Sequence, residues 1–277
     1  MKKKTNILIY VFLIFGLIVI LAPMGIAVLT SVKTQREALQ SLLTLPKSIC
    51  IENYINVLKK PGFLNSFVNT VIVTVVSCFG VVLLTPVVSY AIARNMDKKK
   101  YYMFLYFFLI LGIFVPFQVK MMPLVRVMSD FSLLNIPGLI IVYQASATCE
   151  AVFLYTAYIK GIPADMEEAA YIDGASTFDT YRMIVFPLIK PMTATVVIMD
   201  GLWFWGYFLL PVLTLNRTPK DYTLMLFAYN FRASATGAPN YPEYFAALLL
   251  TMVPIVIVYM FMQKQIMGGL TGGAVKG

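Results

Sequence analysis

The sequence contains no histidine, the side chain most often used for acid–base catalysis and metal binding near neutral pH. This absence argues against a histidine-containing catalytic triad, a histidine proton relay or a histidine metal site. The three cysteines, Cys50, Cys78 and Cys149, are far apart and show neither zinc nor redox spacing. The phosphate-binding pattern G-x-x-x-x-G-K-[ST] is also missing, so we expect the chain to be no enzyme and to hydrolyse no ATP itself.

Charged residues are scarce as well. They make up 13% of the 277 residues, whereas a soluble domain has about a quarter. The chain is 60% hydrophobic, its mean hydropathy is +0.79, and apolar stretches near the length of a membrane-spanning helix recur. We therefore predict an all-α polytopic membrane protein with one transmembrane domain over 1–277. The net charge of +9 then reflects basic residues at the membrane edges rather than nucleic-acid binding.

Six transmembrane helices are expected from the apolar runs. They cover residues 7–30, 63–93, 101–119, 136–159, 192–215 and 243–262. Lysines at positions 2 to 4 and the basic loop 94–100 favour a cytoplasmic N-terminus, because short basic segments next to spans orient them. Six spans then place the C-terminal tail, 264–277, in the cytoplasm too. Pro86 is expected to kink or break the second of these helices, and Pro254 to bend the sixth.

The loop 161–191 is polar although it lies between two apolar spans, and it is expected to be cytoplasmic. Acids in its first turns suit the positive end of a helix dipole: Asp165, Glu167 and Glu168. Gly174 can adopt the left-handed conformation that ends such a helix. Ser176 and Asp179 have capping-box spacing, which predicts a second short helix that ends near Pro187. The pattern therefore indicates helix, turn and helix.

The residues of this loop also carry a family resemblance. Glu168-Ala169-Ala170 is followed after three residues by Gly174, then after nine by Ile184 and after two by Pro187. This spacing resembles the EAA loop of ABC importer permeases, with Phe186 where that family usually has leucine. In that family the loop docks into a cleft on a separate ATPase subunit. The resemblance thus implies a set of ATPase-coupling residues: Glu167, Glu168, Ala169, Ala170, Asp173, Gly174, Ala175 and Pro187.

The resemblance extends over nearly the whole chain and is to the carbohydrate branch, the maltose-type and oligosaccharide-type permeases. The motifs that carry it include Ser89-Tyr90-Ala91 with Arg94, and the C-terminal Gly273-Ala-Val-Lys-Gly277. One departure concerns the site: Gly206 follows Trp205 where this branch commonly has asparagine. Polar contacts that this asparagine would make near the pathway are therefore absent or replaced in this chain.

This resemblance implies a type I permease fold and import of a sugar, a di- or oligosaccharide, delivered by an extracellular binding protein. It implies as partners a second, homologous permease and two copies of an ATPase. ATP and Mg²⁺ would bind to those ATPase subunits, and this chain would bind no cofactor or metal. The location it implies is the bacterial cytoplasmic membrane.

Two acids lie inside expected spans, where a carboxylate needs a compensating environment. Glu150 shares a helical face with Tyr143 and Ser146. Asp200 shares another face with three aromatic residues: Trp203, Phe204 and Tyr207. A carboxylate can accept hydrogen bonds from sugar hydroxyls while flat rings stack on a pyranose, so these five residues are candidates for the translocation pathway.

A structural role is the alternative for each of these residues. Glu150 could be satisfied by a neighbouring helix, and the aromatic residues could belong to a packed core or an interfacial belt. Trp205 lies on another face, toward lipid or a partner permease. At the level of function, the alternatives are an ABC permease for an amino acid or polyamine, or an ion-coupled secondary transporter that uses the two acids. The polar loop 161–191 argues against a secondary transporter, which has no evident need for it. The tail and the aromatic–acid face of the fifth span favour sugar as the substrate.

Overall fold

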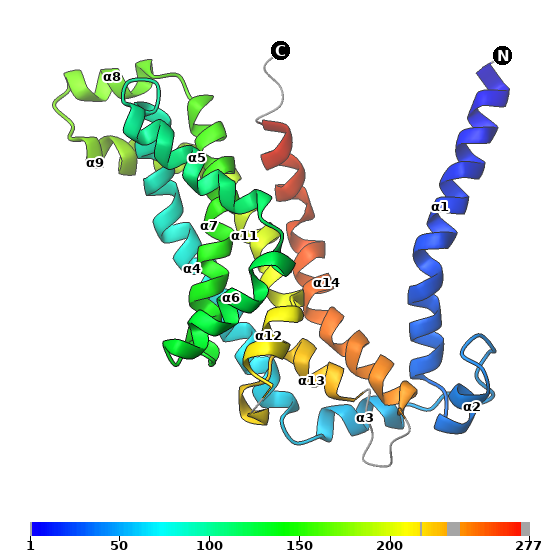
Figure 1. The fold of residues 1–277 in the computed structure, drawn as a ribbon. Coiled ribbons are helices and arrows are strands. Elements are labelled where there is room, and N and C mark those ends of the chain that lie inside the picture. The colour runs from blue at the N-terminus through cyan, green and yellow to red at the C-terminus, as the bar shows by residue number, and fades with distance from the viewer. Residues whose placement is uncertain (1, 217, 232–238, 273–277) are drawn as a thin grey trace. The chain divides into compact units, whose positions relative to one another are not determined.

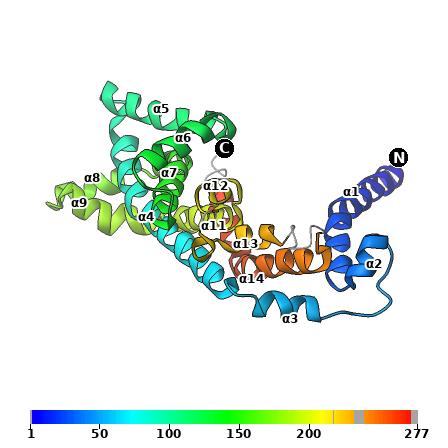
Figure 2. The ribbon, with the colours of Figure 1, turned by 60° about the horizontal axis from the view of Figure 1, so that its bottom comes forward.

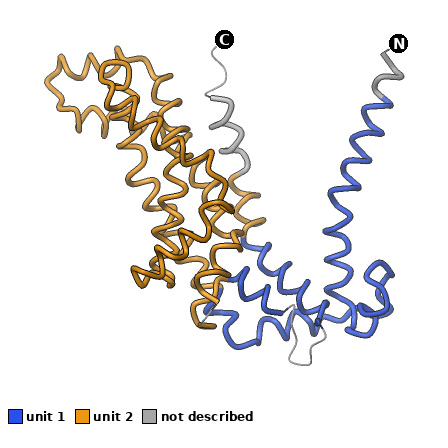
Figure 3. The backbone as a smooth tube through the Cα atoms, in the orientation of Figure 1, with its two compact units in different colours: residues 1–66, 224–254 blue, residues 67–223, 255–277 orange. Residues whose placement is uncertain are grey.

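The computed structural model describes residues 2–216, 218–231 and 239–272. Over these residues the chain consists of helices and connecting loops, without a β-strand. The chain divides into two compact units, which Figure 3 distinguishes by colour. Unit 1 comprises residues 1–66 and 224–254, and unit 2 comprises 67–223 and 255–277. Each unit is described by itself below.

Unit 1 contains four complete helices and the starts of two long ones. They are α1 (Lys2–Ser31), α2 (Gln35–Gln40), α3 (Glu52–Lys59) and α13 (Leu224–Asn230), with the first residues of α4 (Phe63–Asn95) and α14 (Tyr241–Gly272). The apolar side chains of α1 are almost all exposed, so lipid or another subunit must cover them. The loop after α1 is held by Asn53, whose side-chain amide donates to the carbonyls of Ser31 and Lys33 at 2.8 and 2.9 Å.

Unit 2 contains the rest of α4 and α14 together with all the remaining elements. In chain order they are α5 (Lys100–Phe114), α6 (Phe117–Asp130), α7 (Ile136–Lys160), α8 (Asp165–Ile172), α9 (Thr177–Thr180), the π-helical turn η1 (Tyr181–Val185), α10 (Phe186–Leu188), α11 (Lys190–Gly206), α12 (Leu209–Thr214) and the 3₁₀ turn η2 (Pro219–Asp221). Helix α7 lies between α5 and α11 (Figures 1 and 2). Its buried residues include small ones, Ala147 and Ala151, which allow close helix packing.

The described chain has four to six helical segments that could span a membrane, and six were expected. Four helices of the described chain are long and apolar enough to cross a bilayer: Ile7–Ser31, Phe63–Asn95, Ile136–Lys160 and Tyr241–Met262. Two further pairs of helices qualify only when each bent pair counts as one span, which gives up to six. The four single helices correspond to the first, second, fourth and sixth expected spans.

The third expected span, 101–119, is not one straight helix. Helix α5 ends at Phe114, and α6 starts at Phe117 after a bend of 103°. Pro116 explains the break, because a proline disfavours helical backbone in the residue before it. Val115 is accordingly extended, with φ −88° and ψ 106°. Most of the residues between the third and fourth expected spans belong to helix α6.

The fifth expected span, 192–215, is also interrupted. Helix α11 ends at Gly206, Tyr207 is extended, and α12 begins at Leu209. Pro211 lacks an N–H, and its ring would clash with the carbonyl four residues earlier, that of Tyr207. A continuous helix through this point is thus disfavoured. Asp200 lies on α11 and Tyr207 follows its end, so the two residues do not share one helical face as expected.

Two other prolines do not break their helices. Helix α4 continues through Pro86, and α14 continues through Pro254, so neither proline interrupts its helix. Helix α4 has 33 residues, about 50 Å of helix, more than the roughly 30 Å of a bilayer core. Helix α14 includes the start of the expected tail, 264–277. The side chains of that tail and its last five residues lie outside the described structure, as do 217 and 232–238 between the fifth and sixth expected spans.

Candidate functional site

The turn between α8 and α9 has the conformation that its sequence predicts. Gly174 has φ +85°, in the left-handed region. Its N–H donates to the Tyr171 carbonyl at 3.1 Å, and the Ala175 N–H donates to the Ala170 carbonyl at 2.9 Å. This pair of bonds is a Schellman motif, which satisfies carbonyls that the end of α8 would otherwise leave unpaired. Gly174 is therefore required by backbone conformation, since a Cβ built there meets no atom within 4 Å.

The predicted capping box starts α9. The Asp179 N–H donates to Ser176 Oγ at 3.2 Å, and the Ser176 N–H donates to Asp179 Oδ2 at 3.3 Å. The Ser176 hydroxyl and N–H both stabilise the carboxylate and lower the pKa of Asp179 from its usual value. Asp thus replaces the commoner Glu or Gln of this motif, as the sequence suggested.

The α8–α9 pair lies at one end of unit 2 (Figure 1) and exposes most of the residues assigned to coupling. Glu168, Ala169, Asp173, Gly174 and Pro187 are exposed, and Ala170 and Ala175 are half-buried. Large apolar side chains are exposed beside them: Tyr171, Ile172, Phe178 and Met183. Ile172 has 86% of its surface exposed. An apolar patch of this kind in a polar loop indicates a docking surface.

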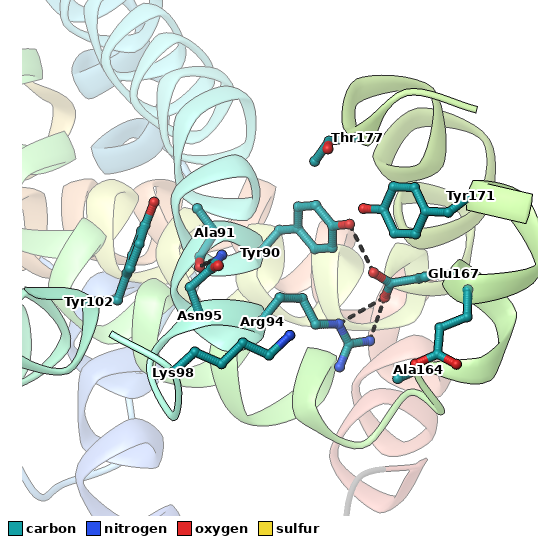
Figure 4. Close-up of a pocket in the computed structure, with 11 residues that line it drawn as sticks. Tyr90, Ala91, Arg94, Asn95, Lys98, Tyr102, Ala164, Glu167, Tyr171 and Thr177 are labelled. Atoms are coloured by element: carbon teal, nitrogen blue, oxygen red, sulfur yellow. Dashed lines mark hydrogen bonds and ion pairs between the residues drawn. The ribbon is translucent and has the colours of Figure 1, made fainter. Parts of the chain in front are cut away.

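Glu167 differs from the other coupling candidates because it points into its own chain and is only 5% exposed. Arg94 Nε and Nη2 both donate to Glu167 Oε1, at 2.8 and 2.6 Å. The Tyr90 hydroxyl donates to Glu167 Oε2 at 2.8 Å. Figure 4 shows these three side chains meeting between α4 and α8. The carboxylate of Glu167 is therefore fully engaged within this chain.

The Arg94–Glu167 pair borders a cavity of about 390 Å³. Its lining comes from the end of α4, from α5 and from the α8–α9 segment, and includes Asn95, Lys98, Tyr102, Tyr171 and Thr177 (Figure 4). Removing one partner from a buried ion pair typically costs about 3–5 kcal/mol, because the other charge is left uncompensated. The partial exposure of the Arg94 side chain, 20%, reduces this cost.

A second cavity, also of about 390 Å³, lies in unit 2 among α5, α6, α7 and α11. Three of the five pathway candidates line it: Glu150, Asp200 and Trp203. Lys120 of α6 lines it too. Asp200 is 7% exposed, and its Oδ2 accepts no hydrogen bond within the described residues. The cavity therefore offers acceptor atoms, one cation and an indole face to a polar molecule.

The other two pathway candidates pack on Tyr143 of α7. Phe204 is 2% exposed and stacks on the Tyr143 ring, with centroids 5.1 Å apart. Tyr207 contacts Tyr143 edge to face at 6.0 Å and lies 4.8 Å from Trp203. Neither is among the residues that line the cavity. The aromatic cluster thus has a packing part and, through Trp203, a cavity-lining part.

Trp205 lies apart from this cluster. It is half-buried and contacts Phe67 of α4 edge to face, with centroids 6.0 Å apart. It thus packs within unit 2 and is not simply a lipid-facing residue.

Sequence reasoning missed the roles of Tyr90, Arg94 and Lys120. The first two appeared only as parts of a family motif, although they lie four residues apart and so share a face of α4. A basic residue at the end of a long apolar span, followed by an acidic loop, was an available signal for their pairing. Lys120 had no comparable signal. Within the described residues, no three histidine, cysteine, aspartate or glutamate side chains form a group that could hold a metal ion.

Comparisons with known proteins extend these observations. Residues 86–270 match the model of a family described as "Binding-protein-dependent transport system inner membrane component". The chain is 42% identical over 268 residues, 96% of each chain, to the multiple sugar-binding transport system permease protein MsmG of Streptococcus mutans. It is 32% identical over 277 residues, 99% of each chain, to the probable starch degradation products transport system permease protein AmyC of Thermoanaerobacterium thermosulfurigenes.

A solved structure has the same fold. It is a bacterial ABC transporter involved in the import of the acidic polysaccharide alginate, and one of its chains matches with a TM-score of 0.81. The match covers 95% of this chain and 96% of the other at 21% identity. The expected all-helical architecture of an ABC importer permease is confirmed by this likeness.

Proposed function

The chain belongs to the family of binding-protein-dependent transport system inner membrane components, and from this premise we propose that it is a permease subunit of an ATP-driven importer of oligosaccharides. As a member of the family it is a multi-pass protein of the inner membrane. The observation that carries the proposal is the solvent-exposed α8–α9 segment. It combines the EAA spacing with exposed apolar side chains that a polar loop would not otherwise need.

In our proposal the α8–α9 segment is the part of the permease that couples transport to ATP hydrolysis on the ATPase. An ATPase subunit contacts Glu168, Ala169 and Ala170 on α8, and Ile172 and Phe178 supply apolar contact area. Asp173, Gly174 and Ala175 shape the turn, and Pro187 lies at the end of the docking segment. ATP and Mg²⁺ bind to the ATPase, of which two copies serve this chain and a second, homologous permease.

The transported molecule is a sugar in this proposal. Relatives named for sugar and starch-product transport support the assignment. The cavity that contains Glu150, Asp200 and Trp203 supports it chemically, because carboxylates accept hydrogen bonds from hydroxyls and an indole can cover the apolar face of a pyranose. A binding protein outside the membrane delivers the sugar.

Uptake by whole cells tests this function. We expect deletion of the gene to abolish accumulation of at least one radiolabelled sugar among maltotriose, raffinose and melibiose, and plasmid-borne wild type to restore it. Labelled glutamine and putrescine are included as matched controls. If the accumulation of glutamine or putrescine depends on the gene and that of none of the sugars does, the permease transports an amino acid or polyamine. The sugar assignment is then wrong.

Membrane topology is a separate prediction. We expect both termini and the α8–α9 segment in the cytoplasm, and the loop between α2 and α3 outside. In a variant without the native cysteines, Ser48→Cys should react with an impermeant maleimide in intact cells, while Ser176→Cys should react only after permeabilisation. Both positions are exposed, so lack of reaction reflects sidedness. Labelling of Ser176→Cys in intact cells would contradict the proposed orientation.

A further inference from the structure

Two side chains at the end of α4 contact three successive parts of the segment that follows α7. Arg94 Nη2 donates to the Ile162 carbonyl at 3.1 Å, before α8 begins. Arg94 and Tyr90 together bind Glu167 within α8. The Tyr90 ring also lies 5.4 Å from the ring of Tyr181, in η1 after α9. Because Tyr90 and Arg94 are one helical turn apart, a single face of α4 holds the start, middle and end of the segment.

The adjacent acids of α8 have opposite environments. Glu167 is buried with both carboxylate oxygens bonded inside the chain, whereas Glu168 is exposed. Consecutive helical residues point about 100° apart, so α8 has one face fixed to α4 and a neighbouring face open to a partner. Glu167 therefore bonds α8 to α4, while Glu168 is accessible to a partner.

The contact between α4 and α8 is localised because a cavity separates them on one side. The cavity of about 390 Å³ lies beside the ion pair, and the polar and charged side chains around it contribute no second ion pair between the two helices in the part of the chain that the structure describes. The Tyr90–Arg94–Glu167 cluster thus contains the one ion pair between α4 and α8 in the described chain (Figure 4).

We propose that Tyr90, Arg94 and Glu167 form a joint that fixes the coupling segment to α4, so that α8 and the end of α4 move as one body during transport. The inference rests on the function proposed above and adds positioning residues to it. Neither Tyr90 nor Arg94 needs to contact the ATPase or the sugar. Their effect is on how motion of the docked segment reaches the membrane helices.

A matched control is available in the same region. Lys160 Nζ lies 3.0 Å from Asp97 Oδ2. This ion pair joins the loop that follows α4 to the last residue of α7. Its side chains are 37% and 78% exposed. Exposed pairs of this kind contribute little, so Asp97→Asn removes an ion pair without removing the joint.

The first experiment measures the joint directly and requires neither ATPase nor sugar. Spin labels are placed at Lys99→Cys and Ile172→Cys, both exposed, in a variant without native cysteines, and the distance distribution between them is recorded in the purified permease. We expect a narrow distribution in the parent and in Asp97→Asn. Glu167→Gln and Arg94→Gln should each at least double its width. The exchange Arg94→Glu with Glu167→Arg should restore most of the narrow distribution.

The second experiment measures coupling. The complex purified on the tagged chain is reconstituted with its binding protein, and accumulation of labelled maltotriose, raffinose or melibiose is compared with ATP hydrolysed. We expect Glu167→Gln to lower sugar transported per ATP at least fivefold while the amount of co-purifying ATPase is unchanged. The charge exchange should recover at least half of the ratio, and Asp97→Asn should keep it unchanged. A role in stability alone would lower protein yield and leave the ratio unaffected.

The outcomes separate this inference from the proposed function. An unchanged distance distribution in Glu167→Gln overturns the joint, whatever the chain transports. A broadened distribution with an unchanged transport ratio overturns its role in coupling. If the wild-type complex accumulates none of the sugars, the proposed substrate is wrong, while the distance measurement still decides whether the joint exists.

Discussion

Replacing Gly174 by valine is expected to lower sugar-stimulated ATP hydrolysis at least about tenfold while the permease remains inserted and paired. Gly174 has φ +85°, and a side chain in this region costs about 1–2 kcal/mol, with β-branched residues worst affected. The strain would open the Schellman turn and shift the surface of α8 that docks to the ATPase. Penalties of this size are comparable with coupling free energies, typically about 1–3 kcal/mol. The measurement is the ATPase rate in vesicles with binding protein and sugar present.

Gly174→Asn is the matched control for this prediction. Asparagine tolerates left-handed backbone, and a Cβ at position 174 meets no neighbouring atom. The asparagine variant should therefore retain most of the stimulation and of the ATPase recovered in a pull-down. Glu168→Lys, which reverses an exposed charge on the proposed docking face, should lose both. Wild-type stimulation and retention in both Gly174→Val and Glu168→Lys would exclude the coupling role of the loop.

Asp200→Asn and Trp203→Ala are each expected to reduce sugar uptake about tenfold without preventing assembly. Asp200 has a buried oxygen with no hydrogen-bond partner in the described chain, and it lines the same cavity as Trp203. A hydrogen bond to a charged group contributes about 1.5–3 kcal/mol, which corresponds to about a tenfold effect or more. The measurement is the initial uptake rate over a range of sugar concentrations, normalised to the amount of permease in the membrane.

Trp205→Ala separates a role in transport from a role in packing. It removes the same number of atoms from the same helix but lies against Phe67, away from the cavity. Uptake per permease molecule should stay near wild type in this variant even if less protein accumulates. Equal losses for the two tryptophans, or normal uptake in both Asp200→Asn and Trp203→Ala, would favour a purely structural role for the aromatic cluster.

Local sequence signals predicted the turn between α8 and α9 well. A left-handed Gly174 and the Ser176–Asp179 capping box involve residues within a few positions of each other, so their spacing is informative on its own. The six apolar regions were also apparent, because a bilayer requires long apolar runs. The breaks at Val115 and Tyr207 were missed since hydropathy averages across them. The prolines at positions 116 and 211 were the signals that should have been given more weight.

The internal bonds of Glu167 could not be predicted in this way. Its partners are 73 and 77 positions earlier in the chain, and their meeting depends on how α4 and α7 pack. The sequence therefore grouped Glu167 with Glu168 as coupling residues of one kind, while their side chains point in different directions. The cavity that joins Lys120 to Glu150 and Asp200 likewise depends on the bend between α5 and α6.

ATP-dependent accumulation of sugar in reconstituted vesicles tests the central claim most directly. The complex purified on this chain is inserted into vesicles with its binding protein and the sugar identified by cellular uptake. We predict that accumulation requires hydrolysable ATP on the side of the α8–α9 segment, and that it is unaffected when ionophores abolish ion gradients. Accumulation that continues without ATP and disappears on addition of ionophores would contradict the account, because the chain would then act as an ion-coupled transporter.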